Sequence, residues 1–196
     1  MKEIAPGVRW YTARRDKIGM DVSSYWLPEE RVVLDPMIPA EGLDAFAEAP
    51  PVHVVMTNRH HDRDAWAFAE RFGSTVHCIR AGLHEIENRG EVEAFDFAEE
   101  LPGGIFVHEV GAICPDETAL HIPARNALAC ADGVINYGGL IFVPDHFMDD
   151  PEDTKAALRA AYARLAADLE FDVLLLAHGD PVASGGREAL REFAAG

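Results

Sequence analysis

The sequence lacks long apolar runs and an apolar leader, and these two absences narrow the class of protein. No apolar run approaches the roughly 20 residues that a membrane-spanning helix needs. The N-terminal stretch MKEIAPGVRW contains no apolar core of the kind that signal peptides carry, so nothing in it directs export. The sequence therefore predicts a cytoplasmic protein that has no membrane partner.

Clustered cysteines and clustered positive charge are also missing. The chain has three cysteines, Cys78, Cys114 and Cys130, an odd count without a C-x-x-C spacing, which indicates reduced thiols in the cytoplasm. The formal net charge is −17, and no group of lysines and arginines interrupts it. Such a field repels phosphate backbones and anionic lipids, which excludes nucleic acid as a partner and favours a small-molecule substrate or ligand.

Repeats, low-complexity tracts and linkers are absent as well. A chain of 196 residues with 48% hydrophobic composition can fill one sizeable core. We therefore expect a single domain that covers residues 1–196.

Short apolar runs and helical stretches alternate in the first half. Gly73 is placed to end a helix as a C-cap. We expect strands over 8–12, 21–27, 31–36, 52–58 and 74–79, and helices over 40–49 and 63–73. The segment 81–101 fits a strand edge or an irregular connection equally well.

The second half has the same style, and a long helix stands out in it. Asp150 and Pro151 are typical of an N-cap and a first helical position. Its apolar residues, Leu158, Tyr162, Leu165 and Leu169, lie on one helix face. We expect strands over 104–110, 118–123, 126–131, 140–144 and 171–179, and a last helix over 184–193 capped by Ser184. The pattern predicts an α/β fold of two packed sheets with helices outside, a four-layer αββα sandwich. Its apolar strand edges favour a homodimer.

The stretch VVMTNRHHDRDAW, residues 54–66, gathers histidine and aspartate between a strand and a helix. Together with "LDP", "CPDETALHIP", "ALACADGVI" and "LLLAHGDPV", it resembles the metallo-β-lactamase superfamily over most of the chain. The resemblance implies an αββα sandwich with one or two zinc or iron ions at the sheet edges. It also implies a T-H-x-H-x-D-H motif, followed by a histidine, an aspartate and a final histidine in later loops.

Only part of that ligand set is present. Four positions match, namely His60, Asp62, Asp132 and His178, and the other three hold Asn58, Arg63 and Ile113. The three-histidine half of the site would consist of Asn58, His60 and Ile113, and isoleucine offers no lone pair for a metal. We therefore expect no two-metal centre.

The other half of the site would be Asp62, Arg63, Asp132 and His178. Three proper ligands suffice for one zinc or another divalent metal with an open position. If Arg63 points into the pocket, its charge disfavours the metal and can neutralise Asp62 and Asp132 through forked hydrogen bonds. If Arg63 points out, a single metal can bind.

Two functions follow from these alternatives. In the first, the protein is a hydrolase of an ester, thioester, lactone or amide, in which one metal activates water and His60 and Asp62 serve catalysis. In the second, the protein is a metal-free and inactive member of the fold that binds a small polar ligand or acts as a scaffold. Asn58, Arg63 and Glu117 would line the pocket, Glu117 as a replacement ligand, and His61 is assigned to the loop or hinge.

Overall fold

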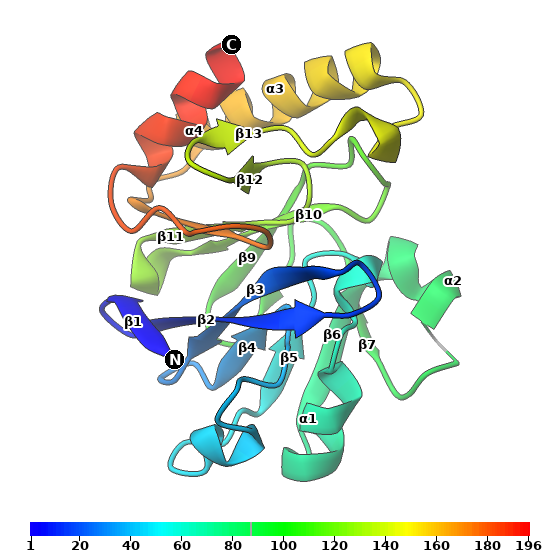
Figure 1. The fold of residues 1–196 in the computed structure, drawn as a ribbon, viewed down its shortest axis with the longest axis vertical. Coiled ribbons are helices and arrows are strands. Elements are labelled where there is room, and N and C mark those ends of the chain that lie inside the picture. Colours follow the sequence, from blue (N-terminus) through cyan, green and yellow to red (C-terminus); the bar gives the residue numbers. More distant parts are fainter. Residues whose placement is uncertain (87) are drawn as a thin grey trace.

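The computed structural model describes residues 1–86 and 88–196, and it contains two large sheets that lie between helices (Figure 1). The first sheet consists, in spatial order, of β1 (Lys2–Ala5), β2 (Val8–Arg15), β3 (Met20–Leu27), β4 (Val32–Leu34), β5 (His53–Val55), β6 (Thr75–Ile79) and β7 (Glu93–Phe95). Pairing is antiparallel from β1 to β4 and parallel from β4 to β7.

The second sheet has the spatial order β14 (Val173–Leu176), β11 (Ala127–Cys130), β10 (Thr118–Ile122), β9 (Ile105–Glu109) and β8 (Glu100–Leu101). Here β11 and β14 pair in parallel, whereas the other neighbours are antiparallel. A small ribbon of β12 (Ile135–Asn136) and β13 (Leu140–Ile141) lies beside this sheet.

Helices cover the outer faces of both sheets (Figure 1). The helix α1 (Ala65–Phe72) contacts β5 and β6, and the short α2 (Leu83–Ile86) follows β6. The helices α3 (Pro151–Asp168) and α4 (Gly186–Ala195) pack on each other over the second sheet. The four-layer αββα arrangement expected from the sequence is confirmed.

The main core fills the space between the sheets and beneath α1. Trp26, Phe46 and Phe68 meet edge to face with ring centroids 5.5 and 5.1 Å apart, which anchors α1 to the first sheet. Tyr25 crosses between the sheets, since its hydroxyl donates to the Leu176 carbonyl at 2.7 Å and accepts from the Leu176 N–H at 2.8 Å. These two hydrogen bonds fix the end of β14 in the second sheet against β3 in the first.

Helix ends follow the sequence at some positions and depart from it at others. Asp150 caps α3 by accepting the N–H groups of Glu152 and Asp153, and Gly73 ends α1 in a left-handed conformation, as expected. The expected helix over 40–49 is wrong, because Gly42 has φ +74° and leaves only a 3-10 turn, η1 (Leu43–Phe46). The cap assigned to Ser184 is also wrong, because α4 begins one residue later, behind Gly185.

The segment 81–101 contains the short strands β7 and β8. They belong to different sheets, so the chain crosses from one sheet to the other between them. The helix α3 ends at Asp168, which leaves Leu169 as its C-cap. Among the helices of the described residues, none combines the length and apolar character needed to span a membrane.

Two pairs of parallel strands decide where polar side chains gather. In the first sheet β4 leads into Asp35 and β5 leads into Thr57 and the 3-10 turn η2 (Arg59–His61). In the second sheet β11 leads into Asp132 and β14 leads into His178. Carboxyl ends of parallel neighbours open at the same sheet edge, where ligands commonly bind in α/β folds. The fold thus brings segments that are far apart in sequence to one edge.

A buried histidine pair on β5 and β6 should make stability depend on pH. His77 is 2% exposed, and its Nε2 lies 3.0 Å from Nδ1 of His53. Burial, with a smaller contribution from His53, lowers the pKa of His77 from 6.5 to about 4. Between these pH values the unfolded chain binds a proton at this position that the folded protein excludes, so the free energy of unfolding falls as the pH falls. The shift corresponds to roughly 2–3 kcal/mol.

His77→Gln should flatten this dependence, because glutamine does not titrate. We expect urea unfolding of the variant to lose roughly 2–3 kcal/mol less than wild type when the pH is lowered from 6.5 to 4. The control is His146→Gln, which removes an exposed imidazole. An equal flattening in both variants would show that burial of His77 is not the cause.

Candidate metal centre

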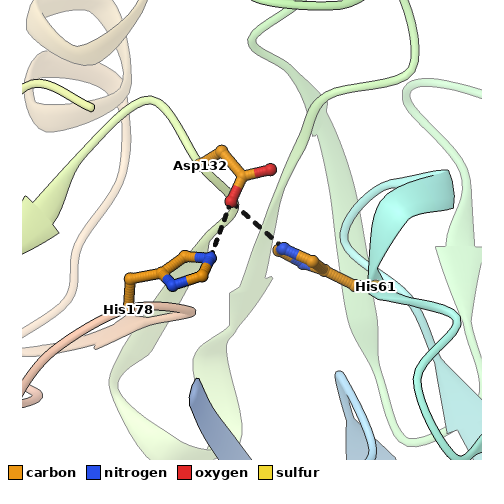
Figure 2. Close-up of side chains that lie close together, drawn as sticks. All are labelled: His61, Asp132 and His178. Atoms are coloured by element: carbon orange, nitrogen blue, oxygen red, sulfur yellow. Dashed lines mark hydrogen bonds and ion pairs between the residues drawn. The ribbon is translucent and has the colours of Figure 1, made fainter. Parts of the chain in front are cut away.

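Three loops from different strands bring His61, Asp132 and His178 together (Figure 2). His61 ends the turn η2 after β5, Asp132 follows β11 by two residues, and His178 follows β14 by two residues. Figure 2 shows both imidazole rings pointing at one oxygen of the Asp132 carboxylate. Nε2 of His61 and Nε2 of His178 each lie 3.1 Å from Oδ1 of Asp132.

Each member of this cluster is oriented by further hydrogen bonds. Nδ1 of His61 lies 3.0 Å from Oδ2 of Asp35 and 2.8 Å from Oγ1 of Thr57, so Nε2 is the nitrogen that faces the cluster. The free oxygen of Asp132, Oδ2, accepts the side-chain N–H of Asn58 at 2.8 Å. In protein metal sites, ligand histidines are typically oriented by a hydrogen bond from their second ring nitrogen to a carboxylate, and ligand carboxylates by a hydrogen-bond donor. Asp35 and Asn58 make these contacts here.

The charges of the cluster are strongly coupled. Burial alone would lower the pKa of His61, but the carboxylates of Asp35 and Asp132 outweigh it and raise the pKa to about 9. Burial alone would raise the pKa of Asp132, but His61 and His178 hold it well below its usual range. In the absence of a metal, the His61 imidazolium lies between two carboxylates and offsets one of their two negative charges. A metal ion would have to displace its proton.

The donor set fits a divalent metal. Its three ligand atoms, two imidazole nitrogens and one carboxylate oxygen, all lie within 4.8 Å of one another. Two histidines and one carboxylate bind zinc in hydrolytic sites, and the same set with open positions binds non-haem iron. The side chains of Asp132 and His178 are 21% and 14% exposed, so the cluster is reachable from solvent. Residues 1–86 and 88–196 contain one such group of three.

His60, the histidine favoured by the sequence, lies outside this group. The side chain of Asn58 accepts the backbone N–H of His60 at 2.9 Å, which fixes the 3-10 turn and directs the next residue, His61, toward Asp35. His60 is exposed. Partial desolvation of its imidazole, followed by the Arg59 charge, lowers the pKa of the ring. The structure therefore places His61, and not His60, next to Asp132 and His178. The sequence assigns His61 to the loop or hinge.

Asp62 is paired with arginines. Its Oδ1 accepts from Nη2 of Arg15 at 3.1 Å and from the backbone N–H of Arg63 at 2.8 Å, and its Oδ2 forms an ion pair with Arg89. The structure does not bring Asp62 into the group with Asp132 and His178. Two guanidinium groups supply the positive charge that the sequence interpretation assigned to a metal.

Arg63 forms neither of the forked pairs considered from the sequence. It has φ +37°, and its guanidinium turns into the space where the sheets meet. Nη1 donates to the carbonyls of Ser23 at 2.5 Å and Asp35 at 2.8 Å, and Nη2 donates to the carbonyl of Ala177 at 3.4 Å. Burial lowers the pKa of this guanidinium. The Arg63 guanidinium therefore does not pair with Asp62 and Asp132. It connects the backbone of Ser23, Asp35 and Ala177 instead.

Asn58 and Glu117 contact the Asp132 loop but do not belong to the group of three ligand atoms. Asn58 donates to Asp132, whereas the Glu117 carboxylate accepts the backbone N–H groups of Gly133 and Ile113. Burial and the charge of Asp132 raise the pKa of Glu117 to about 7. Glu117 therefore supports the Asp132 loop rather than joining its ligand atoms.

The sequence assigns His61 to the loop and gives Asp35 no role, whereas in the structure His61 lies between Asp35 and Asp132. The signal for Asp35 was present, because "LDP" follows a strand that pairs with the strand before the histidine loop. For His61 the available signal was weaker. The sequence does not show which of two adjacent histidines faces Asp132, because that depends on the conformation of the turn on which they lie.

The fold is shared with solved structures, although no protein-family model and no curated protein matches the sequence. The DIM-1 metallo-β-lactamase aligns with a TM-score of 0.72 at 13% identity, covering 99% of this chain and 95% of that one. A metallo-β-lactamase from Pontibacter korlensis aligns with a TM-score of 0.71 at 16% identity, covering 99% and 97%. TTHA1623 in a di-iron-bound form aligns with a TM-score of 0.64 at 18% identity, covering 93% and 92%. This chain therefore has the metallo-β-lactamase fold that its sequence resembles.

Proposed function

We propose that the protein is a hydrolase that binds one divalent metal through His61, Asp132 and His178. The observation that carries the proposal is the convergence of these three side chains, with Asp35 behind His61 and Asn58 behind Asp132. Similarly folded structures include metallo-β-lactamases and a protein in a di-iron-bound form, which supports metal chemistry at this sheet edge. This ligand set keeps His178 and Asp132 from the sequence prediction and takes His61 in place of His60 and Asp62.

A divalent metal held there would act as a Lewis acid on a carbonyl group and would activate water near neutral pH. The chain's own residues would orient the ligands and accept a proton. Asp35 holds the His61 ring with Nε2 facing inward, and Asn58 leaves Oδ1 of Asp132 as the oxygen that faces the two imidazoles. His60 remains a candidate proton acceptor, because its lowered pKa keeps the imidazole neutral at pH 7.

The substrate class that follows is a small molecule with a hydrolysable carbonyl, namely an ester, thioester, lactone or amide. The alternative is a metal-free protein that binds a small polar ligand at the same edge. One observation favours that alternative, because Asp62 is neutralised by Arg15 and Arg89 without a metal. Metal binding decides between the two.

Metal binding should raise the stability of wild type and of matched controls, but not of ligand variants. A metal present at 100 times its Kd stabilises the folded state by about 2.7 kcal/mol. We expect this rise for wild type with zinc or iron(II) in thermal unfolding after chelator treatment. Asp132→Ala and His178→Ala should lose most of it.

The matched controls are Asp149→Ala and His146→Ala, which remove exposed groups of the same two chemical types. Elemental analysis of protein purified without chelator or immobilised nickel should give about one metal per chain. Hydrolysis of a panel of carbonyl substrates by the metal-loaded protein completes the test. A wild type that neither contains metal nor responds to it would leave the metal-free alternative as the better function.

A further inference from the structure

Glu117 is a fully buried glutamate that holds the loop on which Asp132 lies. Its Oε1 accepts the backbone N–H of Gly133 at 2.7 Å, and its Oε2 accepts the backbone N–H of Ile113 at 3.2 Å. Gly133 follows Asp132 directly in the chain. The carboxylate therefore fixes the peptide that joins the proposed ligand to its neighbour.

The residue after Glu117 holds the other ligand-bearing loop. Thr118 donates to the carbonyl of Thr57 twice, from its backbone N–H at 3.0 Å and from Oγ1 at 2.7 Å. Thr57 in turn contacts His61 at Nδ1. Two consecutive residues thus connect the loop of Asp132 with the loop of His61, one from each sheet.

Packing behind the Asp132 loop leaves it little freedom. A Cβ on Gly133 would lie 2.4 Å from the Tyr162 hydroxyl, 2.5 Å from Cδ2 of Leu158 and 2.8 Å from Oε1 of Glu117. The loop is therefore pressed between α3 and Glu117 with no space for a side chain. A change in the length or hydrogen bonding of residue 117 is transmitted to the Asp132 backbone, because there is no gap to absorb it.

We propose that Glu117 is a positioning residue for the metal site, which sets the place of the Asp132 carboxylate through the Gly133 N–H. This inference rests on the proposed function, since it needs a metal to bind at His61, Asp132 and His178. Residues that orient metal ligands typically contribute 10–100-fold to metal affinity. Glu117 does so through the backbone of the next residue instead of through the ligand's side chain.

Glu117→Gln tests the proposal with little change of shape. The amide oxygen can accept one of the two N–H groups, but its NH2 group must face the other, so the loop has to shift. We expect the Kd for zinc, measured by competition with a chromophoric chelator, to weaken about 10–100-fold. Glu117→Asp, whose carboxylate is one methylene shorter, should weaken zinc binding too. It keeps the question answerable if the glutamine variant does not fold.

The control is Glu30→Gln, because Glu30 is also nearly buried but pairs with Arg125, away from the site. It should lower thermal stability and leave the zinc Kd unchanged. The absorption spectrum of the cobalt(II)-loaded protein gives a second readout, which should change in the Glu117 variants and not in Glu30→Gln.

The outcomes separate the two proposals. If wild type binds zinc and both Glu117 variants bind it within about twofold while only their stability falls, Glu117 is structural and the positioning role is wrong. If wild type binds neither zinc nor cobalt, the metal-dependent function fails, and the positioning role fails with it.

Discussion

Arg63→Met is expected to lower the free energy of unfolding by about 3 kcal/mol or more. The guanidinium donates to three backbone carbonyls, those of Ser23, Asp35 and Ala177. Each hydrogen bond from a charged group contributes about 1.5–3 kcal/mol, and the cost of burying the charge offsets part of the sum. Ser23 lies in β3, and Asp35 and Ala177 directly follow β4 and β14, so the loss loosens both sheets at the edge where the candidate site lies.

Urea unfolding of the chelator-treated protein measures this effect, and Arg14→Met, which removes an exposed arginine from the same region, is the control. Methionine fills much of the arginine's volume, so the difference reports on the hydrogen bonds rather than on a cavity. A variant as stable as wild type would mean that the burial cost of the guanidinium equals everything its three hydrogen bonds contribute.

The same residue separates two interpretations of the site. If Arg63 replaced a metal by pairing with Asp62 and Asp132, zinc would restore part of the stability lost in Arg63→Ala, and Arg63→His would gain zinc affinity. Because Arg63 contacts carbonyls instead, we expect zinc to stabilise these variants no more than it stabilises wild type. A larger zinc response in Arg63→His would contradict the contacts that the structure shows.

Much of the fold follows from local sequence signals. Asp150 with Pro151 starts α3, Gly73 ends α1, and the apolar runs mark most of the strands, because each of these features depends on neighbouring residues alone. Where a single glycine changes the backbone, as Gly42 does ahead of η1, a helix expected from composition shrinks to one turn. The order of layers is predicted by the pattern of strands and helices and also implied by the resemblance, and it is confirmed by the shared fold.

The site was harder to predict because its decisive contacts are non-local. Asp132 and His178 could be named from sequence, since each follows a strand in a loop that resembles the family's. The choice between His60 and His61 depends on a 3-10 turn that the Asn58 side chain fixes. The pairing of Asp62 depends on Arg15, 47 positions earlier in the chain. Neither spacing nor composition reports such contacts.

Gly179→Ala is expected to be the most damaging single substitution considered for this edge, lowering stability by more than about 4 kcal/mol or preventing folding. Gly179 follows His178 and has φ +80°, and an added Cβ would lie 1.9 Å from the carbonyl oxygen of Asn136. That oxygen belongs to the backbone, so no side chain can rotate away to make room. The bond from the Asn136 N–H to the His178 carbonyl, at 3.2 Å, would be lost as the segment moves.

Gly138→Ala separates backbone strain from this clash. Gly138 has φ +87°, close to that of Gly179, but nothing lies within 4 Å of an added Cβ, so only the left-handed conformation is penalised. We expect a loss of about 1–2 kcal/mol for Gly138→Ala and an unchanged zinc response. In any Gly179→Ala protein that folds, zinc should stabilise weakly, because the displaced backbone carries His178 away from Asp132. Equal losses of stability in the two variants, measured by urea unfolding, would show that the 178–180 turn is not packed against Asn136 as the structure has it. A full zinc response in Gly179→Ala would instead show that His178 is not needed to hold the metal, since the clash acts on its backbone directly.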